Sequence, residues 1–443
     1  MNKTSSGRLW WFVLPLFWVC HISAVAQEDV NQSQPTSTFQ PQPVGPTTPG
    51  AAQPGTPYMG TSGLAGSPFN LADYASPGTG LAAWGPFSVD PHLFYSFTYA
   101  SGLEALPGAN STTAINTVSP GLLLKIGSHW TLDYSPNLSF YSNPNFRDTT
   151  DQHVALKGGT TYGDWTLSLV QSYINTTDPL VETGTQVEQD VYATALNAAW
   201  QMNSHLSLQL GLDQNFRAAQ VLSDLYEWET SDWIDYQFER QLGVAIGVIG
   251  GYDELSVGSD MPFERIEAGM NFQPGTKLSL QLTGGIEDRQ FVHPSAPSLV
   301  TPIFNATARY QILEGTSFTV AGNRTVTPSF FGNEVNVITS VMAGVRQHIV
   351  GTMYFSVNGG YVLESFTTIA PAALPPSDSG GPTTADLVET RSDTRTSVKF
   401  SLSTTFRARL DASIFYLLND NGSSQANFSY SGSQVGLLLN YRF

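Results

Sequence analysis

Long runs of strictly alternating side chains constrain the fold of this chain more than any other feature. In the run from Trp130 to Phe140, the large apolar residues fall on one face and the small or polar residues on the other. Runs that begin at His205, Lys277 and Thr352 repeat the pattern. An alternation of 180° per residue predicts β-strands, because a helix would spread the same residues around its circumference.

The length of these runs favours membrane strands over soluble ones. Each run lasts about 9 to 13 residues, whereas strands of soluble proteins usually stop at about 5 or 6. A tilted strand needs about 9 to 11 residues to cross a bilayer. We count eighteen such runs between His92 and Phe443.

Short turns alternate with longer polar loops along this region. Tight turns are predicted near Ser128, Asp164, Ser204, Gln241, Gly275, Gly315, Ile349 and Arg407. Longer loops are predicted at 143–151, 175–186, 218–231 and, longest of all, 364–389. Short turns at one end and long loops at the other are typical of transmembrane β-barrels. We therefore predict an all-β, antiparallel, up-and-down transmembrane barrel of about 18 strands, within a range of about 16 to 20.

Aromatic side chains support this prediction, because they gather at both ends of the predicted outward faces. Near the tight turns or the terminus lie Trp130, Trp165, Trp200, Phe272, Tyr310, Phe318, Phe406 and Phe443. Near the opposite ends lie Tyr99, Phe140, Tyr173, Tyr252, Tyr361 and Tyr416. Two aromatic girdles around an aliphatic band are expected at the two surfaces of a bilayer, and a soluble β-sandwich has no reason to form them.

Composition excludes several other classes of protein. Only 12% of the residues are charged, about half the usual share. The net charge of -17 argues against a nucleic-acid partner, since phosphate binding needs basic patches. The mean hydropathy of -0.10 is too low for a bundle of membrane helices.

Residues 1–26 are predicted to be a signal peptide. Lys3 and Arg8 precede an apolar run, and Ala24-Val25-Ala26 provides a small-x-small cleavage site. A retained membrane anchor is the alternative, but Pro15 interrupts the run. The single cysteine, Cys20, would leave with this segment, so the exported chain would form no disulfide.

Residues 27–91 are predicted to be a disordered tether, and 92–443 the barrel. The tether holds 11 of the 27 prolines, together with Gly, Ser, Thr and Gln. Such a segment buries too little apolar surface to offset its ordering entropy. A passive linker is the preferred interpretation, and threading of part of it into a pore is the alternative.

The region from His92 to Phe443, with its exported leader, resembles the bacterial outer-membrane β-barrel proteins, and among them the β-barrel porin family. The most specific feature is the last strand, which ends on Phe443 with Leu437, Leu439 and Tyr441 at alternate positions before it. In that family such an ending resembles the signal read by the barrel assembly machinery. The resemblance implies contact with outer-membrane lipid and lipopolysaccharide, and both termini in the periplasm. Porins of this size are often trimers, which makes a homotrimer one expectation, although the sequence identifies no subunit contact.

The sequence predicts neither catalysis nor a cofactor or metal. His205 and Asp213 lie on one face of one strand, but eight residues separate them by about 26 Å. The sequence has no Cys/His cluster, no phosphate-binding glycine loop and no Gly-x-Ser-x-Gly motif.

Charged residues of the inward face are the candidate functional residues. The predicted pore-lining set is Lys125, Asp133, Lys157, Asp213, Glu267, Glu287, Arg309, Arg346, Arg395, Lys399, Arg409, Asp411 and Arg442, and Glu239 and Arg265 share its parity. Such residues choose between anions and cations in a channel, or they only pair and solvate the wall. Cations dominate the last third of the chain, so we hypothesise an anion-attracting patch that includes Arg395 and Arg409.

Most other acidic residues are predicted to lie in the long loops. They include Asp148, Asp151, Asp224, Glu227, Glu229, Asp253, Glu254, Asp260 and Glu364. A solvated rim is the simple interpretation, and bridging of divalent cations to lipopolysaccharide is the alternative.

The leading function is passive diffusion of small hydrophilic solutes across the outer membrane. One alternative is a substrate-specific exporter, for example of polysaccharide, that acts with periplasmic partners through the Pro-rich segment. A second is a non-conducting structural or adhesive barrel. The insertion at 364–389 either folds into the lumen or projects outward.

Overall fold

The computed structural model describes residues 82–102, 112–177, 186–220, 222–292, 296–370, 386–407 and 409–443. All of them belong to one compact unit. The predicted signal peptide, most of the predicted tether and the centre of the long 364–389 insertion lie outside these residues. No helix in the described ranges is long and apolar enough to cross a membrane.

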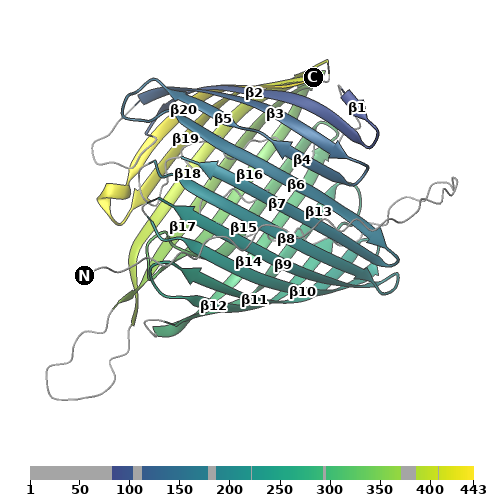
Figure 1. The fold of residues 1–443 in the computed structure, drawn as a ribbon, viewed down its shortest axis with the longest axis vertical. Helices are drawn as coiled ribbons and strands as arrows, with labels where there is room; N and C mark the ends of the chain where they lie inside the picture. The colour runs from purple at the N-terminus through teal and green to yellow at the C-terminus, as the bar shows by residue number, and fades with distance from the viewer. Residues whose placement is uncertain are drawn as a thin grey trace, which may run out of the picture. The chain divides into compact units, whose positions relative to one another are not determined.

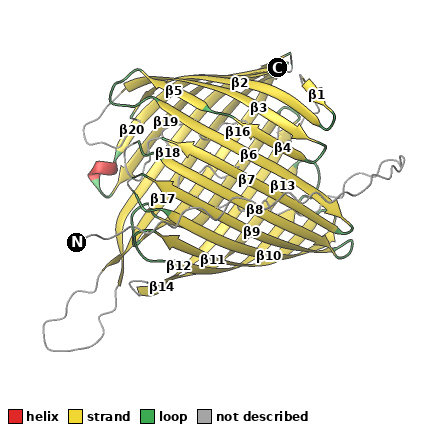
Figure 2. Ribbon diagram, in the orientation of Figure 1, coloured by secondary structure: helices red, strands yellow, loops and turns green. Residues whose placement is uncertain are grey.

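Eighteen antiparallel strands form a closed barrel, as predicted (Figure 1). Its strands are β2 (Phe87–Ser101), β3 (Thr112–Ile126), β4 (Trp130–Tyr134) with β5 (Asn137–Tyr141), β6 (Thr149–Tyr162), β7 (Trp165–Thr176), β8 (Gln189–Gln201), β9 (Leu206–Ala219), β10 (Leu225–Glu239), β11 (Leu242–Leu255), β12 (Met261–Phe272), β13 (Leu278–Phe291), β14 (Ala296–Leu313), β15 (Thr316–Pro328), β16 (Glu334–Val350), β17 (Met353–Ala370), β18 (Asp386–Phe406), β19 (Leu410–Ser423) and β20 (Tyr430–Arg442). A short strand β1 (Ala82–Trp84) precedes them, and a 3-10 turn, η2 (Ala426–Phe428), lies between β19 and β20 (Figure 2).

The barrel closes between its first and last strands. β2 pairs with β20 from His92–Arg442 to Ser101–Ser433, and every other wall strand pairs with its neighbours in sequence. Closure leaves no free sheet edge along this seam, which hydrocarbon requires because it offers no water to an unpaired backbone group.

Two facing prolines interrupt the third wall strand. The register of β3 with β4 and β5 sets Pro120 opposite Pro136. The Ser135 N–H donates to His153 on β6, so the backbone nitrogen of Pro136 faces β3. Neither proline has an N–H, and this rung loses both of its hydrogen bonds. The single run predicted from Trp130 to Phe140 is therefore divided into β4 and β5.

The first wall strand begins at Phe87, before the predicted start of the barrel at His92. β20 pairs with β2 only from His92 onward. β1 pairs with the preceding stretch of β2, as in the Trp84–Phe87 pair, so it covers the edge that β20 leaves open. The long insertion is shorter than predicted, since β17 continues to Ala370 and β18 begins at Asp386.

Alternation divides each strand into an outer and an inner face. On β10, Tyr226, Trp228 and Ile234 are exposed, while Glu227 and Glu229 between them are buried. The same alternation on β20 sets Val435, Leu437, Leu439 and Tyr441 on the outer face, together with the exposed terminal Phe443. That the assembly machinery reads these residues stays a prediction.

The tip of the β15–β16 hairpin leaves the wall and folds over the barrel interior. β14 and β15 pair only as far as Phe304–Arg324. Beyond that point Val326, Val335 and Val337 of the hairpin pack with the inward-facing Leu225 and Met261. Pro302 on β14 and Pro328 on β15 have no N–H to extend the ladder, and prolines in sheets are confined to edges and bulges.

Candidate functional site: the lumen

The inner face of the barrel has two walls of opposite charge. The acidic wall is the inner face of β9–β13, where Asp213, Glu227, Glu229, Asp235, Asp253, Glu267 and Glu287 outnumber Arg217, Arg265 and Arg289. The basic wall is the inner face of β14–β20 outside the hairpin tip, where Arg309, Arg346, Arg391, Arg395, Lys399 and Arg442 outnumber Glu364, Asp393 and Asp411. Register brings these residues together from strands far apart in sequence.

A buried ion-pair network occupies the acidic wall near its loop end. Glu287 accepts from both neighbours, at 2.7 Å from the Arg265 Nε and 2.8 Å from the Arg289 Nε. Arg265 also donates to Glu229 at 3.0 Å, and Arg289 donates to Asp253. Every charged group in this network has an opposite partner, and its three carboxylates exceed its two guanidinium groups by one negative charge.

One aromatic ring lies between the two arginines of this network. The guanidinium carbons of Arg265 and Arg289 each lie 4.5 Å from the ring centroid of Phe263. The negative face of the ring attracts both cations. Phe263 also fills the space beside Gly251 on β11, where an added Cβ would approach the ring to 2.1 Å. The glycine thus permits the ring to lie flat against the wall and hold the guanidinium groups.

The loop end of the basic wall contains a second buried group of charges. Arg395 donates to Glu364, and the Arg391 Nε lies 3.2 Å from Asp393. The Arg391 guanidinium lies between Phe366 at 3.7 Å and Phe428 at 4.1 Å. These cations are therefore buried and compensated.

Toward the turn end, the basic wall carries cations of a different kind. Arg309 on β14, Arg346 on β16 and Lys399 on β18 form no ion pair with any residue that the structure describes. The register runs from Arg309 through Thr319, Gly344 and Asn358 to Lys399, so two of the three share one rung. Arg309 and Arg346 are exposed to the lumen. Their positive charge is available to a solute.

Some of the other residues predicted to line the pore form ion pairs in the structure, and others do not. Lys125 pairs with Asp90 at 2.7 Å, and Arg442 pairs with Asp411 at 2.7 Å. Lys157 is exposed on the inner face of β6, Glu267 is half-buried, and Arg409 lies in the turn before β19. Asp133 and Asp213 are buried on the inner face. That the set lines a conducting pore stays a prediction, and Arg395 is a buried partner of Glu364 rather than a free cation.

Sequence reasoning missed most of the acidic wall. Glu227, Glu229 and Asp253 were assigned to a solvated loop rim, as were Asp151 and Glu364 elsewhere on the inner face, but all five are buried in strands. The error arose from strand length, because β10 begins at Leu225 rather than near Asp232. The alternation of side chains continues through Glu227 and Glu229, and this pattern could have predicted the longer strand.

The hairpin tip narrows the loop end of the lumen. Phe330 is buried between Val187 and Leu222, and its ring lies 3.8 Å from the guanidinium carbon of Arg217 on β9. The Ser223 N–H donates to the Phe330 carbonyl at 3.3 Å. The tip therefore reaches from β15–β16 to the β9–β10 connection.

One Ser/His/Asp group lies on the inner face behind the interrupted strand. The His92 Nε2 lies 3.1 Å from the Ser135 hydroxyl and 3.8 Å from Asp133, and the hydroxyl donates to Asp133 at 3.0 Å. In a nucleophilic triad the acid holds one ring nitrogen and the serine meets the other. Here both groups meet the same nitrogen, so this geometry is not a triad.

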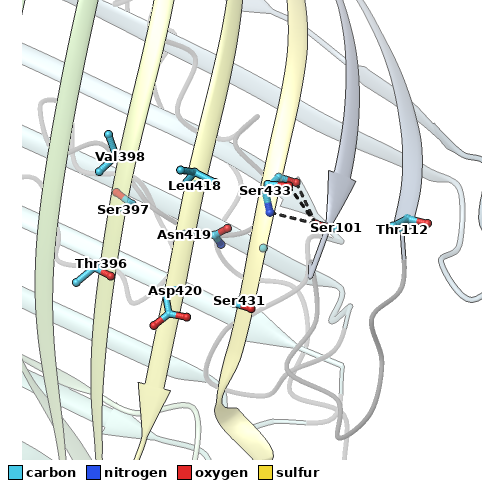
Figure 3. Close-up of a pocket in the computed structure, with 11 residues that line it drawn as sticks. Ser101, Thr112, Thr396, Ser397, Val398, Leu418, Asn419, Asp420, Ser431 and Ser433 are labelled. Atoms are coloured by element: carbon cyan, nitrogen blue, oxygen red, sulfur yellow. Dashed lines mark hydrogen bonds between the residues drawn. The ribbon is translucent and has the colours of Figure 1, made fainter.

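A pocket of about 580 Å³ lies outside the lumen. Figure 3 shows its lining on neighbouring strands, with Thr396 and Val398 from β18, Leu418 and Asp420 from β19, and Ser433 from β20. These residues have outer-face parity. Small serine and threonine side chains leave this hollow on the exterior.

The closed wall, the apolar exterior and the charged interior define the class of protein: an outer-membrane β-barrel with the strand number of a large porin. No protein-family model matches the sequence, and no curated protein does. Among solved structures, the chain is similar to Pseudomonas aeruginosa OpdK with vanillate, at 12% identity and a TM-score of 0.44 over 80% of this chain and 98% of that one. It is also similar to Pseudomonas aeruginosa OpdO, at 12% identity and a TM-score of 0.45 over 81% of this chain and 97% of that one. A third similar structure is Pseudomonas aeruginosa OccK2 (OpdF) in complex with glucuronate, at 10% identity and a TM-score of 0.45 over 80% of this chain and 98% of that one.

Proposed function

We propose that this protein is a diffusion channel for small hydrophilic solutes, with a preference for anions. A barrel of 16 to 18 strands is too wide for its own side chains to fill and leaves an aqueous passage. The long-loop end would face the exterior and the termini the periplasm, as in other outer-membrane barrels.

The observation that carries the anion preference is the difference between the two walls. The carboxylates of the acidic wall are mostly buried, and Glu229, Asp253 and Glu287 are paired. Arg309 and Arg346 of the basic wall are exposed and have no ion pair within the described ranges. A permeating solute therefore meets more available positive than negative charge at the turn end.

Aromatic rings hold two of these cations in place. The Arg346 guanidinium carbon lies 4.1 Å from the Tyr354 ring centroid, and the Lys399 Nζ lies 4.7 Å from that of Phe415. A ring face attracts a cation without cancelling its charge, unlike a carboxylate. These contacts orient Arg346 and Lys399 and leave their charge available to anions.

The test is the reversal potential of single channels in a KCl gradient across a planar bilayer. We expect the wild type to favour chloride and the triple variant Arg309→Glu, Arg346→Glu, Lys399→Glu to favour potassium. Arg240→Glu, in the exposed turn between β10 and β11, is the matched control and should behave as wild type. An unchanged reversal potential in the triple variant would refute the anion preference, and absence of conductance would refute the channel.

A further inference from the structure

A chain of hydrogen bonds on the inner face joins an exposed imidazole to a buried carboxylate. The His92 Nε2 lies 3.1 Å from the Ser135 hydroxyl, and this hydroxyl donates to Asp133 at 3.0 Å. The His92 side chain is 20% exposed, whereas the Asp133 side chain is 4% exposed. Protons and ions in the lumen can therefore reach the imidazole directly, but not the carboxylate.

The serine hydroxyl determines which ring nitrogen of His92 carries a hydrogen. A hydroxyl has one proton to donate, and Ser135 directs its proton to Asp133. Toward His92 the hydroxyl can then only accept, so the His92 Nε2 carries a hydrogen and donates it. The other ring nitrogen, Nδ1, sets the charge, because a proton there makes the ring a cation. The ring can gain this charge without losing its bond to Ser135.

A glycine on the intervening strand gives the imidazole its position. His92 on β2 is the register partner of Gly121 on β3, and an added Cβ at Gly121 would overlap the imidazole ring. The ring therefore lies across β3 and reaches the third wall strand. Asp133 on β4 and Ser135 directly after β4 meet it there.

The neighbouring strands bring further charged groups to the surroundings of His92. On β20, Arg442 is the register partner of His92, and it pairs with Asp411 at 2.7 Å. On β3, Lys125 pairs with Asp90 at 2.7 Å. Asp133 forms no ion pair with a Lys or Arg in the residues described, and the His92 Nε2 lies 3.8 Å from it.

A second histidine faces the same carboxylate from β6. Ser135 donates its N–H to the His153 carbonyl at 2.9 Å, which makes Asp133 a diagonal neighbour of His153, about 7 to 8 Å away. On its own strand, His153 has a buried Asp151 and an exposed Lys157 on the inner face. β7, on its other side, contains no charged residue. His92 lies nearer to the carboxylate and is joined to it through Ser135, so His92 is the candidate for a change of charge.

We propose that His92 is a specificity-determining residue of the channel and that its charge depends on pH; this inference rests on the anion-preferring channel proposed above. Histidine changes its charge between about pH 5 and 8. In neutral solution this part of the wall carries the negative charge of Asp133, and in acid the imidazolium of His92 compensates it. Chloride is therefore favoured more strongly in acid than in neutral solution.

The test is the reversal potential of single channels in a KCl gradient, measured at about pH 7.5 and about pH 5.8. We expect the chloride-to-potassium permeability ratio of the wild type to rise roughly 1.5-fold in acid, as for one partly screened charge about 10 Å from the path. His92→Gln, which stays neutral, should show less than about half of this rise. His92→Lys, which stays charged, should have the acid ratio at both pH values. His129→Gln, in the exposed turn between β3 and β4, is the control and should behave as wild type.

Heat-modifiable mobility on gels confirms that each variant is folded. A wild-type ratio that is equal at the two pH values would overturn the role of His92. A folded His92→Gln with the full rise, or a folded His92→Lys whose ratio still rises in acid, would overturn it too. A wild type that favours potassium at both pH values, with a rise that His92→Gln abolishes, would support the role of His92 and refute the anion preference.

Discussion

Glu287 holds the ion-pair network of the acidic wall together, and its substitution by glutamine tests the importance of that network. The carboxylate is fully buried and accepts one hydrogen bond from Arg265 and one from Arg289. A glutamine can accept only through its oxygen, and its amide nitrogen would face the other guanidinium donor to donor. The variant therefore loses the charge and at least one of the two bonds.

The expected loss of stability depends on which carboxylate each arginine still pairs with in the variant. Removing one partner of a buried ion pair typically costs about 3 to 5 kcal/mol. Arg265 retains Glu229 and Arg289 retains Asp253, so we expect the lower end, about 3 kcal/mol. Glu229→Gln removes one bond of a residue that lies at the edge of the network, and about half that loss is expected.

The assay is urea unfolding of the barrel in lipid vesicles, followed by tryptophan fluorescence. Glu264→Gln is the control, since Glu264 is outward and exposed on the same strand as Arg265. We expect the free energy of unfolding to be highest, and equal, for the wild type and Glu264→Gln, lower for Glu229→Gln and lowest for Glu287→Gln. A Glu287→Gln variant with the free energy of unfolding of the control would refute the reasoning.

Three further predictions concern the channel and its assembly. Phe330→Ala should raise single-channel conductance, because it removes the ring that holds the hairpin tip on Arg217; Phe330→Leu should change it less, and equal conductance in all three proteins would contradict the proposed narrowing. Phe443→Ala should lower the heat-modifiable, folded fraction in membranes, because the terminal ring is exposed and packs edge-on to Tyr441 at 4.7 Å; Ser431→Ala, at the opposite end of β20, is the control, and an unchanged folded fraction would count against an assembly role. Deletion of residues 27–81 should leave conductance unchanged, because the strands that the structure describes begin at Ala82 and form the barrel without this segment; loss of conductance would favour the exporter interpretation.

Alternation alone predicted the barrel, its strand number and the face of most side chains. The rule needs only a residue and its neighbours two positions away, so it was correct for Tyr361, Tyr416 and Arg309 alike. It failed where tightly spaced acids suggested a loop, as at Glu227 and Glu229, because polar residues alternate with aromatic ones there instead of with aliphatic ones.

Partners across strands could not be predicted from the sequence. Arg395 and Arg309 look alike in their local sequence, yet register places Glu364 beside one and no described carboxylate beside the other. The inward fold of the β15–β16 hairpin tip could not be predicted from the sequence either. Val335 and Val337 alternate like any wall residues, and only the end of the ladder at Arg324 turns them toward Leu225.

The seam between β2 and β20 has a consequence for how the protein folds. It joins Ser101 to Ser433, 332 positions apart in sequence, while every other strand pairing in the wall joins strands that are neighbours along the chain. Contacts of such separation form slowly, because a long loop must close before they contribute. A nascent chain can therefore pair its strands one hairpin after another, and the sheet still has two unpaired edges, at β2 and at the last strand formed, until β20 pairs with β2. Completion of the barrel depends on β20, the thirteen-residue strand that is the last of the barrel to be synthesised, and a chain truncated before it should accumulate as an open, aggregation-prone sheet.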